Sequence, residues 1–523
     1  MALSDFRNEP FTDFSNAENA AAMTRALAEV EAQLGRTYPL IIDGEKMTTT
    51  ATIASINPAN PSQVVGYVAS ASAAQAAQAI VQANKRFEIW RKVPATARAD
   101  YLFKLADEMR RRKFELCAWI IYEVSKNWAE ADGDVAEAID FCMFYGNEML
   151  RLAGPHAVYQ LPGEHAELHY VPIGAGVAIP PWNFPLAITT NLVVAPLVTG
   201  NTVVLKPSPR SPVIAAKLLE MLEAVGVPAG VVNFVTGEDA VIGDVLVDHP
   251  QTRFVGFTGS KEIGLRVNER AAKVQPGQKW IKRTMLEMGG KDTTIVDETA
   301  DLDAAAQGIA AAAFGFQGQK CSACSRVVAV ASVYDSLLAK VIERARTLSV
   351  GDPSQPDTSL GAVIDDRSIN KIRHYLALGQ QEGRLVLGGE MPADDAPRRE
   401  GAGYFVPPTI FADVAPDARL SQEEVFGPVL TFVKADDFEQ AMVIANNTEY
   451  GLTGGLFSRD EARLARAGED FHVGNLYLNR KITGAMVGVH PFGGFNMSGT
   501  DSKTGGPDYL QLYMQGKSIA RKV

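Results

Sequence analysis

Cysteine is scarce in this chain: 523 residues include four cysteines, too few for a disulfide framework. Basic charge is not in excess either, and the net charge of −11 predicts no surface for nucleic acid. No apolar run is long enough to cross a bilayer, since prolines and asparagines interrupt even the most apolar region, 171–200. No basic stretch followed by an apolar one, the pattern of an export signal, opens the sequence. We therefore expect a cytoplasmic protein that binds neither membranes nor nucleic acid.

Repeats, low-complexity tracts and the dinucleotide-binding fingerprint G-x-G-x-x-G are also missing. The length exceeds what one hydrophobic core usually supports, so two or three domains are expected. Ser15 and Glu18 have the spacing of a capping box, which predicts the start of an amphipathic helix that includes 20–35. The helical spacing of apolar residues predicts two further long helices before residue 130.

Between residues 175 and 273, strand-like apolar runs alternate with helical segments, and the alternation begins again after residue 287. This pattern is typical of parallel sheets with crossover helices and predicts two α/β domains. Such sheets bind ligands beyond the carboxyl ends of their strands, where Lys206-Pro-Ser and Thr258-Gly-Ser lie. Segments 155–171 and 497–523 fit neither domain, and their alternating apolar residues suggest strands that pair with another subunit.

Two of the four cysteines, Cys321 and Cys324, form a CxxC in FGFQGQKCSACSR. A structural zinc site needs about four ligands, but Cys117 and Cys142 lie far earlier in the chain and no histidine is near, so no metal is predicted. A redox pair, two packed structural cysteines and a nucleophile all remain open. A nucleophile would need a base and an oxyanion donor from other segments.

Other segments offer candidates for both roles. Glu287 lies beside two glycines, whose bare backbone lets a carboxylate approach a ligand closely. Asn183 lies between two prolines in a stiff loop, and a rigid side-chain amide suits an oxyanion hole. Ser260 opens a helix after a strand and could face a phosphate. Taken singly, Glu287 could also be an ordinary surface glutamate, Asn183 a turn asparagine, and Ser260 part of a plain strand-to-helix turn.

Seven motifs together resemble those of the aldehyde dehydrogenase superfamily, and the resemblance covers nearly the whole chain. They are PWNFP (181–185), KPSP (206–209), FTGS (257–260), LEMGGKD (286–292), GQKC (318–321), EEVFGPV (423–429) and PFGG (491–494). The resemblance implies an α/β fold with a Rossmann-like cofactor domain and a catalytic domain, both open sheets, and a β-strand extension for oligomerisation.

On this basis we expect an NAD-binding domain at 1–154 and 172–286, and a catalytic domain at 287–480. Segments 155–171 and 497–523 would form the oligomerisation extension of a homo-oligomer, either a dimer or an assembly built from dimers. Segment 481–496 would be the substrate anchor loop.

The resemblance also implies the catalytic roles. Cys321 matches the nucleophile of the family, whereas Cys324 stands where the family asks for no particular residue and is interpreted as packing. Glu287 matches the general base that activates the hydrolytic water. Asn183 and the N–H of Cys321 would hold the oxyanion.

For the cofactor, the resemblance implies NAD. The matching positions are Lys206 and Ser208 after one strand, Gly259 and Ser260 after another, and Glu424 and Phe426 near the nicotinamide ribose. NADP stays open, because Pro209 stands where many NAD-preferring relatives carry an acidic residue, and Arg210 after it could reach a 2′-phosphate.

The tail of the sequence, NRKITGAMVGVHPFGGFNMSGTDSKTGGPDYL, resembles the subgroup of the family that oxidises L-glutamate 5-semialdehyde to glutamate in proline degradation. The resemblance implies that the N–H groups of Gly484 and Ala485 and the hydroxyl of Ser322 hold the amino-acid end of the substrate. Phe184 and Phe492 would flank its aliphatic part. It also suggests a proline dehydrogenase as a partner.

Other functions stay open beside this one. They are an aldehyde dehydrogenase of other or broader specificity, a catalytically silent binding protein of the same family, and a cysteine hydrolase without cofactor.

Overall fold

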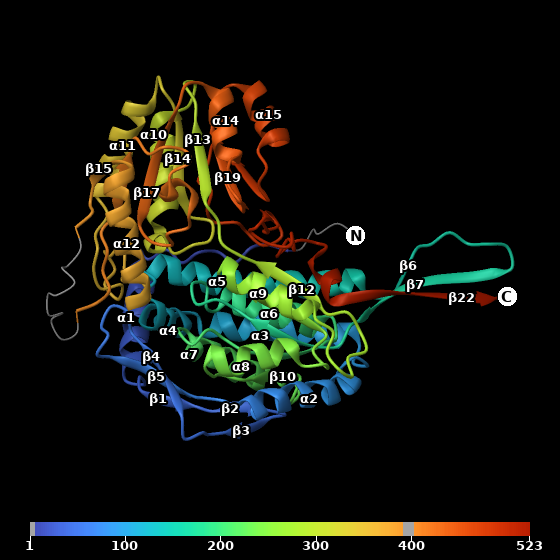
Figure 1. The fold of residues 1–523 in the computed structure, drawn as a ribbon. Coiled ribbons are helices and arrows are strands. Elements are labelled where there is room, and N and C mark those ends of the chain that lie inside the picture. The colour runs from blue at the N-terminus through green and yellow to red at the C-terminus, as the bar shows by residue number, and fades with distance from the viewer. Residues whose placement is uncertain (1–5, 391–401) are drawn as a thin grey trace.

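The computed structural model describes residues 6–390 and 402–523. The first five residues of the predicted NAD-binding domain, and residues 391–401 of the predicted catalytic domain, lie outside this part. The chain forms two α/β lobes, one above the other in Figure 1, and a narrow sheet that projects from the lower lobe. The predicted α/β fold class is confirmed.

The lower lobe is built on a sheet with the strand order β12-β11-β8-β9-β10-β2-β3, in which the first five strands are parallel. Its strands are β2 (Leu40–Ile42), β3 (Glu45–Met47), β8 (Ala175–Ile179), β9 (Thr202–Leu205), β10 (Val232–Phe234), β11 (Phe254–Thr258) and β12 (Arg283–Glu287). The chain runs from β8 to β9 and β10 and then returns to the other side of β8 with β11. Ligands of open sheets bind at such a reversal of strand order.

The helices between these strands are α6 (Ala187–Val198), α7 (Pro212–Ala224), α8 (Asp239–Asp248) and α9 (Lys261–Ala272). The predicted alternation from β8 to α9 is confirmed in full. Strand β12 was not predicted, although it carries Glu287 at its carboxyl end.

The N-terminal part adds a small sheet and five helices to the lower lobe. They are β1 (Arg36–Tyr38), β4 (Thr52–Ile56), β5 (Val64–Ala69), α1 (Ala17–Glu31), α2 (Ala73–Trp90), α3 (Ala95–Arg111), α4 (Lys113–Val124) and α5 (Trp128–Leu152). The second of the two long helices predicted before residue 130 is thus two helices. Arg112 separates them with φ −102° and ψ 15°, and its guanidinium binds Glu115 of α4 at 2.6 Å.

The predicted capping box at Ser15 and Glu18 is wrong. Helix α1 is capped by Asn16, whose side-chain oxygen accepts hydrogen bonds from the N–H groups of Glu18 and Asn19 at 2.8 and 3.4 Å. The hydroxyl of Ser15 donates to Asp13 at 2.6 Å instead. An asparagine one position later satisfies the same free N–H groups, which is why the spacing alone misplaced the cap.

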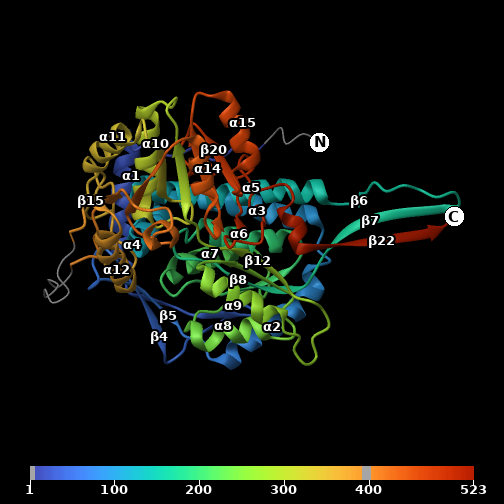
Figure 2. The same cartoon turned by 45° about the horizontal axis from the view of Figure 1, so that its top comes forward.

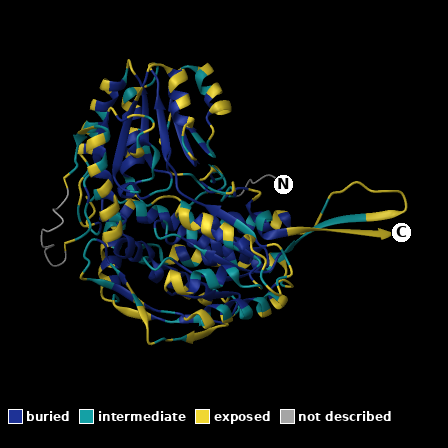
Figure 3. Cartoon of the chain, in the orientation of Figure 1, coloured by how far each residue is buried: buried dark blue, intermediate teal, exposed yellow. Residues whose placement is uncertain are grey.

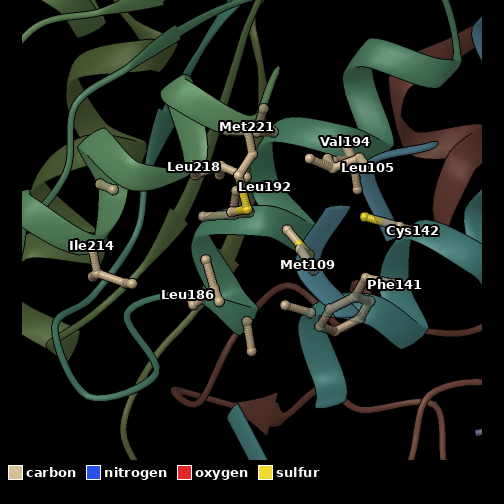
Figure 4. Packing of buried hydrophobic residues seen from close by; sticks show 14 of the residues in the cluster. Leu105, Met109, Phe141, Cys142, Leu186, Leu192, Val194, Ile214, Leu218 and Met221 are labelled. Atoms are coloured by element: carbon tan, nitrogen blue, oxygen red, sulfur yellow. The ribbon is translucent and has the colours of Figure 1, made fainter. Parts of the chain in front are cut away.

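The core of the lower lobe surrounds α6, which is predominantly apolar and buried along nearly all of its length. Figure 4 shows side chains of this cluster from α3, α5, α6 and α7, among them Leu105, Cys142 and Val194. Cys142 and Cys117 are both fully buried in it. These two cysteines therefore serve packing.

The upper lobe carries the second sheet, with the order β15-β16-β17-β14-β13-β19-β20; all its pairs are parallel except that of the edge strand β15. Its strands are β13 (Asp292–Val296), β14 (Cys324–Val330), β15 (Arg384–Leu387), β16 (Thr409–Ala412), β17 (Val429–Ala435), β19 (Thr453–Phe457) and β20 (Asn475–Leu478). Its main helices are α10 (Leu302–Phe314), α11 (Tyr334–Arg346), α12 (Asp366–Glu382), α14 (Phe438–Asn446) and α15 (Glu461–Asp470).

The projecting sheet consists of β6 (Pro155–His156), β7 (Glu164–Pro172) and β22 (Met514–Lys522). Strand β22 pairs with β7 along its whole length, from Met514 opposite Pro172 to Lys522 opposite Glu164. The sheet stands away from both lobes in Figures 1 and 2, and β22 is exposed along most of its length in Figure 3.

The predicted start of the second extension segment, residue 497, is too early. Only 514–522 forms the projecting strand, whereas Tyr509, Leu510 and Tyr513 are buried in the core of the lower lobe. Upstream of them, the carbonyl oxygen of Ser498 accepts a hydrogen bond from the N–H of Met288 at 2.7 Å. Residues 497–513 therefore belong to the body of the protein.

Candidate active site

A cleft of about 460 Å³ lies between the two lobes. It opens at the carboxyl ends of β8, β9 and β11, next to the reversal of strand order, as expected for a ligand site of an open sheet. From the sequence-predicted set, its walls include Asn183, Lys206, Ser208, Gly259, Ser260, Cys321, Glu424 and Phe426. The lower lobe supplies the first five of these residues and the upper lobe the last three.

Cys321 lies in the turn before β14, half-buried in the wall of the cleft. Burial raises the pKa of its thiol, and the carboxyl groups of Asp292, Glu424 and Glu287 raise it further. Because the thiolate is the nucleophile, this thiol needs a base to take its proton. Gly290 permits the close packing here, since a Cβ on it would lie 2.6 Å from the carbonyl oxygen of Cys321.

Cys324 has a different environment. Its side chain is buried in the apolar cluster of the upper lobe, and its sulfur lies 3.2 Å from the hydroxyl oxygen of Thr294. Burial raises the pKa of this thiol to about 12. The two thiols of the CxxC are both free, and the described residues contain no cluster of three or more His, Cys, Asp or Glu side chains that would hold a metal ion.

Asn183 follows β8 in the proline-rich loop and is buried. Its side-chain amide donates a hydrogen bond to the carbonyl oxygen of Gln319 at 3.1 Å, two residues before Cys321. This bond joins the loop of the lower lobe to the turn of the upper lobe that carries Cys321. One of the two amide hydrogens is used in it, and the other is available to a ligand.

Glu287 ends β12 and is enclosed by the C-terminal segment. Its Oε1 accepts a hydrogen bond from the hydroxyl of Ser502 at 2.5 Å, whereas its buried Oε2 has no partner among the described residues. Burial raises the pKa of Glu287 to about 7, against the hydrogen bond from Ser502 and the positive charge of Lys503. A carboxyl group that titrates near neutral pH is suited to proton transfer.

The part of the cleft where the sequence predicts the cofactor contains a buried lysine and a helix terminus. Lys206 follows β9 and forms an ion pair with Asp239 at the start of α8. Ser260 caps α9, whose first N–H groups are therefore at the cleft. Gly259 is tightly packed, because a Cβ on it would lie 2.6 Å from the ring of Phe257.

Glu424 lies half-buried on the opposite wall, and its Oε1 accepts a hydrogen bond from the N–H of Gly290 at 3.0 Å. A Cβ on Gly289 would come within 2.4 Å of the same carboxyl group. The two glycines of LEMGGKD thus make room for different neighbours. The missing side chain of Gly289 leaves space for the carboxyl group of Glu424, and that of Gly290 leaves space for the carbonyl group of Cys321. Phe426 has a left-handed backbone with φ 61°, and its ring packs edge-on against Trp182, with 5.6 Å between the centroids.

Arg210, which kept NADP open in the sequence, is already paired in the structure. Its guanidinium binds the carboxyl group of Asp365, and that carboxyl group also caps α12 by accepting from the N–H of Ser368 at 2.8 Å. Arg210 would have to leave this pair to bind a 2′-phosphate.

Three of the predicted substrate contacts, Ser322, Phe184 and Phe492, are not among the residues that line the cleft. Ser322 follows Cys321 directly and is buried. Phe184 has the ammonium group of Lys126 3.9 Å from its ring centroid, and this lysine in turn forms a fully buried ion pair with Asp134 at 3.0 Å. Phe492 is fixed through its backbone, which exchanges two hydrogen bonds with Thr504 at 2.9 and 2.7 Å.

The anchor loop presents free backbone donors. Gly484 is exposed and has φ 77°, a conformation that favours glycine. Within residues 6–390 and 402–523, no acceptor binds the N–H of Gly484 or of Ala485. Two adjacent free N–H groups in such a turn can bind a carboxylate.

The sequence did not point to Ser502, Asp239 or Lys371. Ser502 contacts Glu287, Asp239 pairs with Lys206, and Lys371 lies in the cleft wall, where its charge favours the ionised form of Glu424. For Asp239 the visible sign was its place directly before the helix predicted at 240–249, although the observed helix α8 already begins at this residue.

Residues 45–519 match the aldehyde dehydrogenase family, and the chain belongs to this family. Within it, the chain is 55% identical over 515 residues to the 1-pyrroline-5-carboxylate dehydrogenase of Geobacillus kaustophilus. The match covers 98% of this chain and 99% of that protein. The structure of 1-pyrroline-5-carboxylate dehydrogenase from Thermus with bound NAD is 49% identical and superimposes with a TM-score of 0.96 over the full length of both chains.

A third similar structure is proline utilization A (PutA) from Bdellovibrio bacteriovorus, which is 44% identical with a TM-score of 0.96. The match covers all of this chain and 54% of that one.

None of the helices in the described part of the chain has the length and apolar character to cross a bilayer.

Proposed function

We propose that this protein oxidises L-glutamate 5-semialdehyde, which is in equilibrium with 1-pyrroline-5-carboxylate, to L-glutamate with NAD, as in the second step of proline degradation. The observation that carries the proposal is that Cys321 and Asn183, from distant segments, line one cleft, and that Glu287 lies near enough for its charge to raise the pKa of Cys321. The near full-length identity to 1-pyrroline-5-carboxylate dehydrogenases supports the choice of substrate.

NAD fits the residues that line the cleft. The start of α9 at Ser260 offers N–H groups to a pyrophosphate, and Lys206 with Asp239 offers polar contacts to a ribose. Glu424 would hold the second ribose. NAD, when bound, supplies the acceptor for the hydride.

Catalysis begins at Cys321. Its thiol releases its proton to solvent and attacks the aldehyde carbon, which becomes a tetrahedral thiohemiacetal, while Glu287 stays ionised for the second step. The side-chain amide of Asn183 and the N–H of Cys321 stabilise its oxyanion. Loss of the hydride leaves a thioester on Cys321. Glu287 then takes a proton from a water molecule, which attacks the thioester and releases glutamate.

The anchor loop gives the site its preference. The N–H groups of Gly484 and Ala485 would bind the carboxylate of the substrate, with the hydroxyl of Ser322 as a further donor. Phe184 and Phe492 would flank the aliphatic chain. A substrate without a carboxylate gains nothing from these donors, so simple aldehydes should react less well.

The assembly belongs to the same proposal. We assign 1–154 and 172–286 to NAD binding, 287–480 to catalysis, and 155–171 with 514–523 to contacts between subunits of a cytoplasmic homo-oligomer built from dimers. The exposed side chains of Ile519 on β22 and of Tyr159 and Leu161 in the loop between β6 and β7 support this role. The likeness to part of proline utilization A supports a proline dehydrogenase as the partner that supplies the substrate.

The test is steady-state turnover of glutamate semialdehyde and propanal, each with NAD and with NADP. We expect the highest kcat/KM for glutamate semialdehyde with NAD, because Arg210 is held by Asp365. An equal or higher kcat/KM for propanal would favour the alternative, an aldehyde dehydrogenase of broader specificity.

A further inference from the structure

The N-terminal segment before α1 reaches the substrate anchor loop. The side-chain amide of Asn8 donates to Oδ2 of Asp140 on α5 at 2.8 Å and to the carbonyl oxygen of Val487 in the loop at 2.9 Å. The N–H of Glu9 donates to the other oxygen of Asp140 at 2.7 Å. Both oxygens of this buried carboxyl group thus bind the N-terminal segment.

Apolar packing also holds the N-terminal segment against the anchor loop. The rings of Phe6 and Phe144 pack edge-on, with 5.3 Å between their centroids. Gly488 fits beneath them, because a Cβ on it would lie 3.1 Å from atoms of both rings. Its φ of 76° and the hydrogen bond from its N–H to the carbonyl oxygen of Gly505 at 2.9 Å turn the loop back into the protein.

The loop is held on its other side by Arg480. The guanidinium of this residue donates to the carbonyl oxygens of Thr483 and Gly484 at 3.4 and 3.3 Å. The two free N–H groups of Gly484 and Ala485 therefore lie between two points at which the loop is held. Arg480 binds the carbonyl groups of Thr483 and Gly484, and Asn8 binds that of Val487. Donors that are fixed before binding lose less entropy when the substrate arrives.

We propose that Asn8 is a positioning residue of the substrate anchor: by joining Asp140 of α5 to the carbonyl of Val487, it holds the backbone donors of Gly484 and Ala485 in place for a carboxylate. Asn8 touches neither substrate nor cofactor in this proposal and acts through the loop. The inference rests on the proposed function, since it takes the loop as the carboxylate site.

The experiment compares Asn8→Ala with Asn19→Ala, a matched control on α1. The amide of Asn19 is exposed and donates to the carbonyl oxygen of Asp13 at 2.9 Å, so it has the same chemistry without contact with the loop. Asn8→Ala removes the hydrogen bonds to Asp140 and Val487; loss of the bond to the loop should raise the KM for glutamate semialdehyde roughly 2- to 10-fold, with little change in kcat. The kcat/KM for propanal and the KM for NAD should stay within about twofold of the wild type.

Hydrogen exchange of peptides from 481–496 gives a readout independent of turnover. Faster exchange in Asn8→Ala but not in Asn19→Ala, together with the selective rise in KM, is the expected result. Unchanged exchange, or equal losses on both aldehydes, would overturn the proposal. A wild-type protein without preference for glutamate semialdehyde would contradict the proposed function itself, whereas the exchange rates would still decide whether Asn8 braces the loop.

Discussion

The hydroxyl of Ser502 donates a hydrogen bond of 2.5 Å to Oε1 of Glu287, across 215 positions of sequence. Both side chains are buried. The C-terminal segment therefore contributes directly to the state of the proposed general base. A hydroxyl that donates to a carboxylate favours its ionised form, so Ser502 limits the rise in the pKa of Glu287 that burial causes.

Ser502→Ala should move the acid limb of the kcat–pH profile to higher pH. The wild-type limb is expected near pH 7, the pKa of Glu287, because the carboxyl group must be ionised to act as a base. Without the hydroxyl the charged form loses a donor, the pKa rises, and the limb should shift upward by about 1 pH unit. Ser502→Thr keeps a hydroxyl and should restore the profile; an unshifted limb in Ser502→Ala would show that the contact does not tune the base.

Cys321→Ala should abolish dehydrogenase activity and leave NAD binding and folding nearly intact. Cys324→Ala should keep most activity, since this thiol is buried beside Thr294 and away from the cleft. Turnover and NAD titration of the two variants check this. Similar losses in both would revive the interpretation of the CxxC as a redox pair.

Gly484→Val should lower kcat/KM for glutamate semialdehyde far more than for propanal. A valine at φ 77° is strained and must shift the backbone donors, and an unpaired carboxylate oxygen costs about 1–3 kcal/mol, or roughly 5- to 150-fold. Gly35→Val is the matched control, because Gly35 has φ 79° with open space around it and lies in another part of the chain. Equal losses on both aldehydes in Gly484→Val would make the loop structural only.

Deletion of 514–523 should lower the oligomeric state measured by sedimentation. The deletion removes β22, so β7 loses the strand with which it pairs along its whole length, and the projecting sheet loses most of its hydrogen bonds. The deletion retains Tyr509 and Tyr513, which pack in the core, so the lobes should still fold. An unchanged mass in solution would argue against a role in assembly.

The elements that the sequence predicted best are those decided locally. Each parallel strand from β8 to β11 is a short buried run, and each is followed by a helical segment, so the alternation identified the sheet. Strand β12 was missed because Arg283-Thr-Met-Leu-Glu begins with half-buried polar residues and lacks the apolar run that marks the other strands. The cap of α1 failed because Ser15 and Asn16 both suit that role.

The site was predicted where a motif marks it and missed where only folding brings residues together. Cys321, Glu287 and Asn183 lie within motifs, whereas Ser502 looks like any polar residue of a loop. Ser502 reaches Glu287 because the antiparallel bridge between Glu287 and Gly499 joins the C-terminal segment to β12. Pairing over such a distance leaves no local pattern in one sequence.

The most direct test of the account is the first turnover of Glu287→Gln with NAD and glutamate semialdehyde. Because Cys321 would still form the thioester but the water would lack its base, one equivalent of NADH per site should appear as a burst, followed by steady-state turnover slowed about 10²- to 10⁴-fold. Cys321→Ala, the control, should give no burst. A Glu287→Gln variant that produces no NADH even in its first turnover would contradict the assignment of Glu287 to hydrolysis and would show that it chiefly activates the thiol.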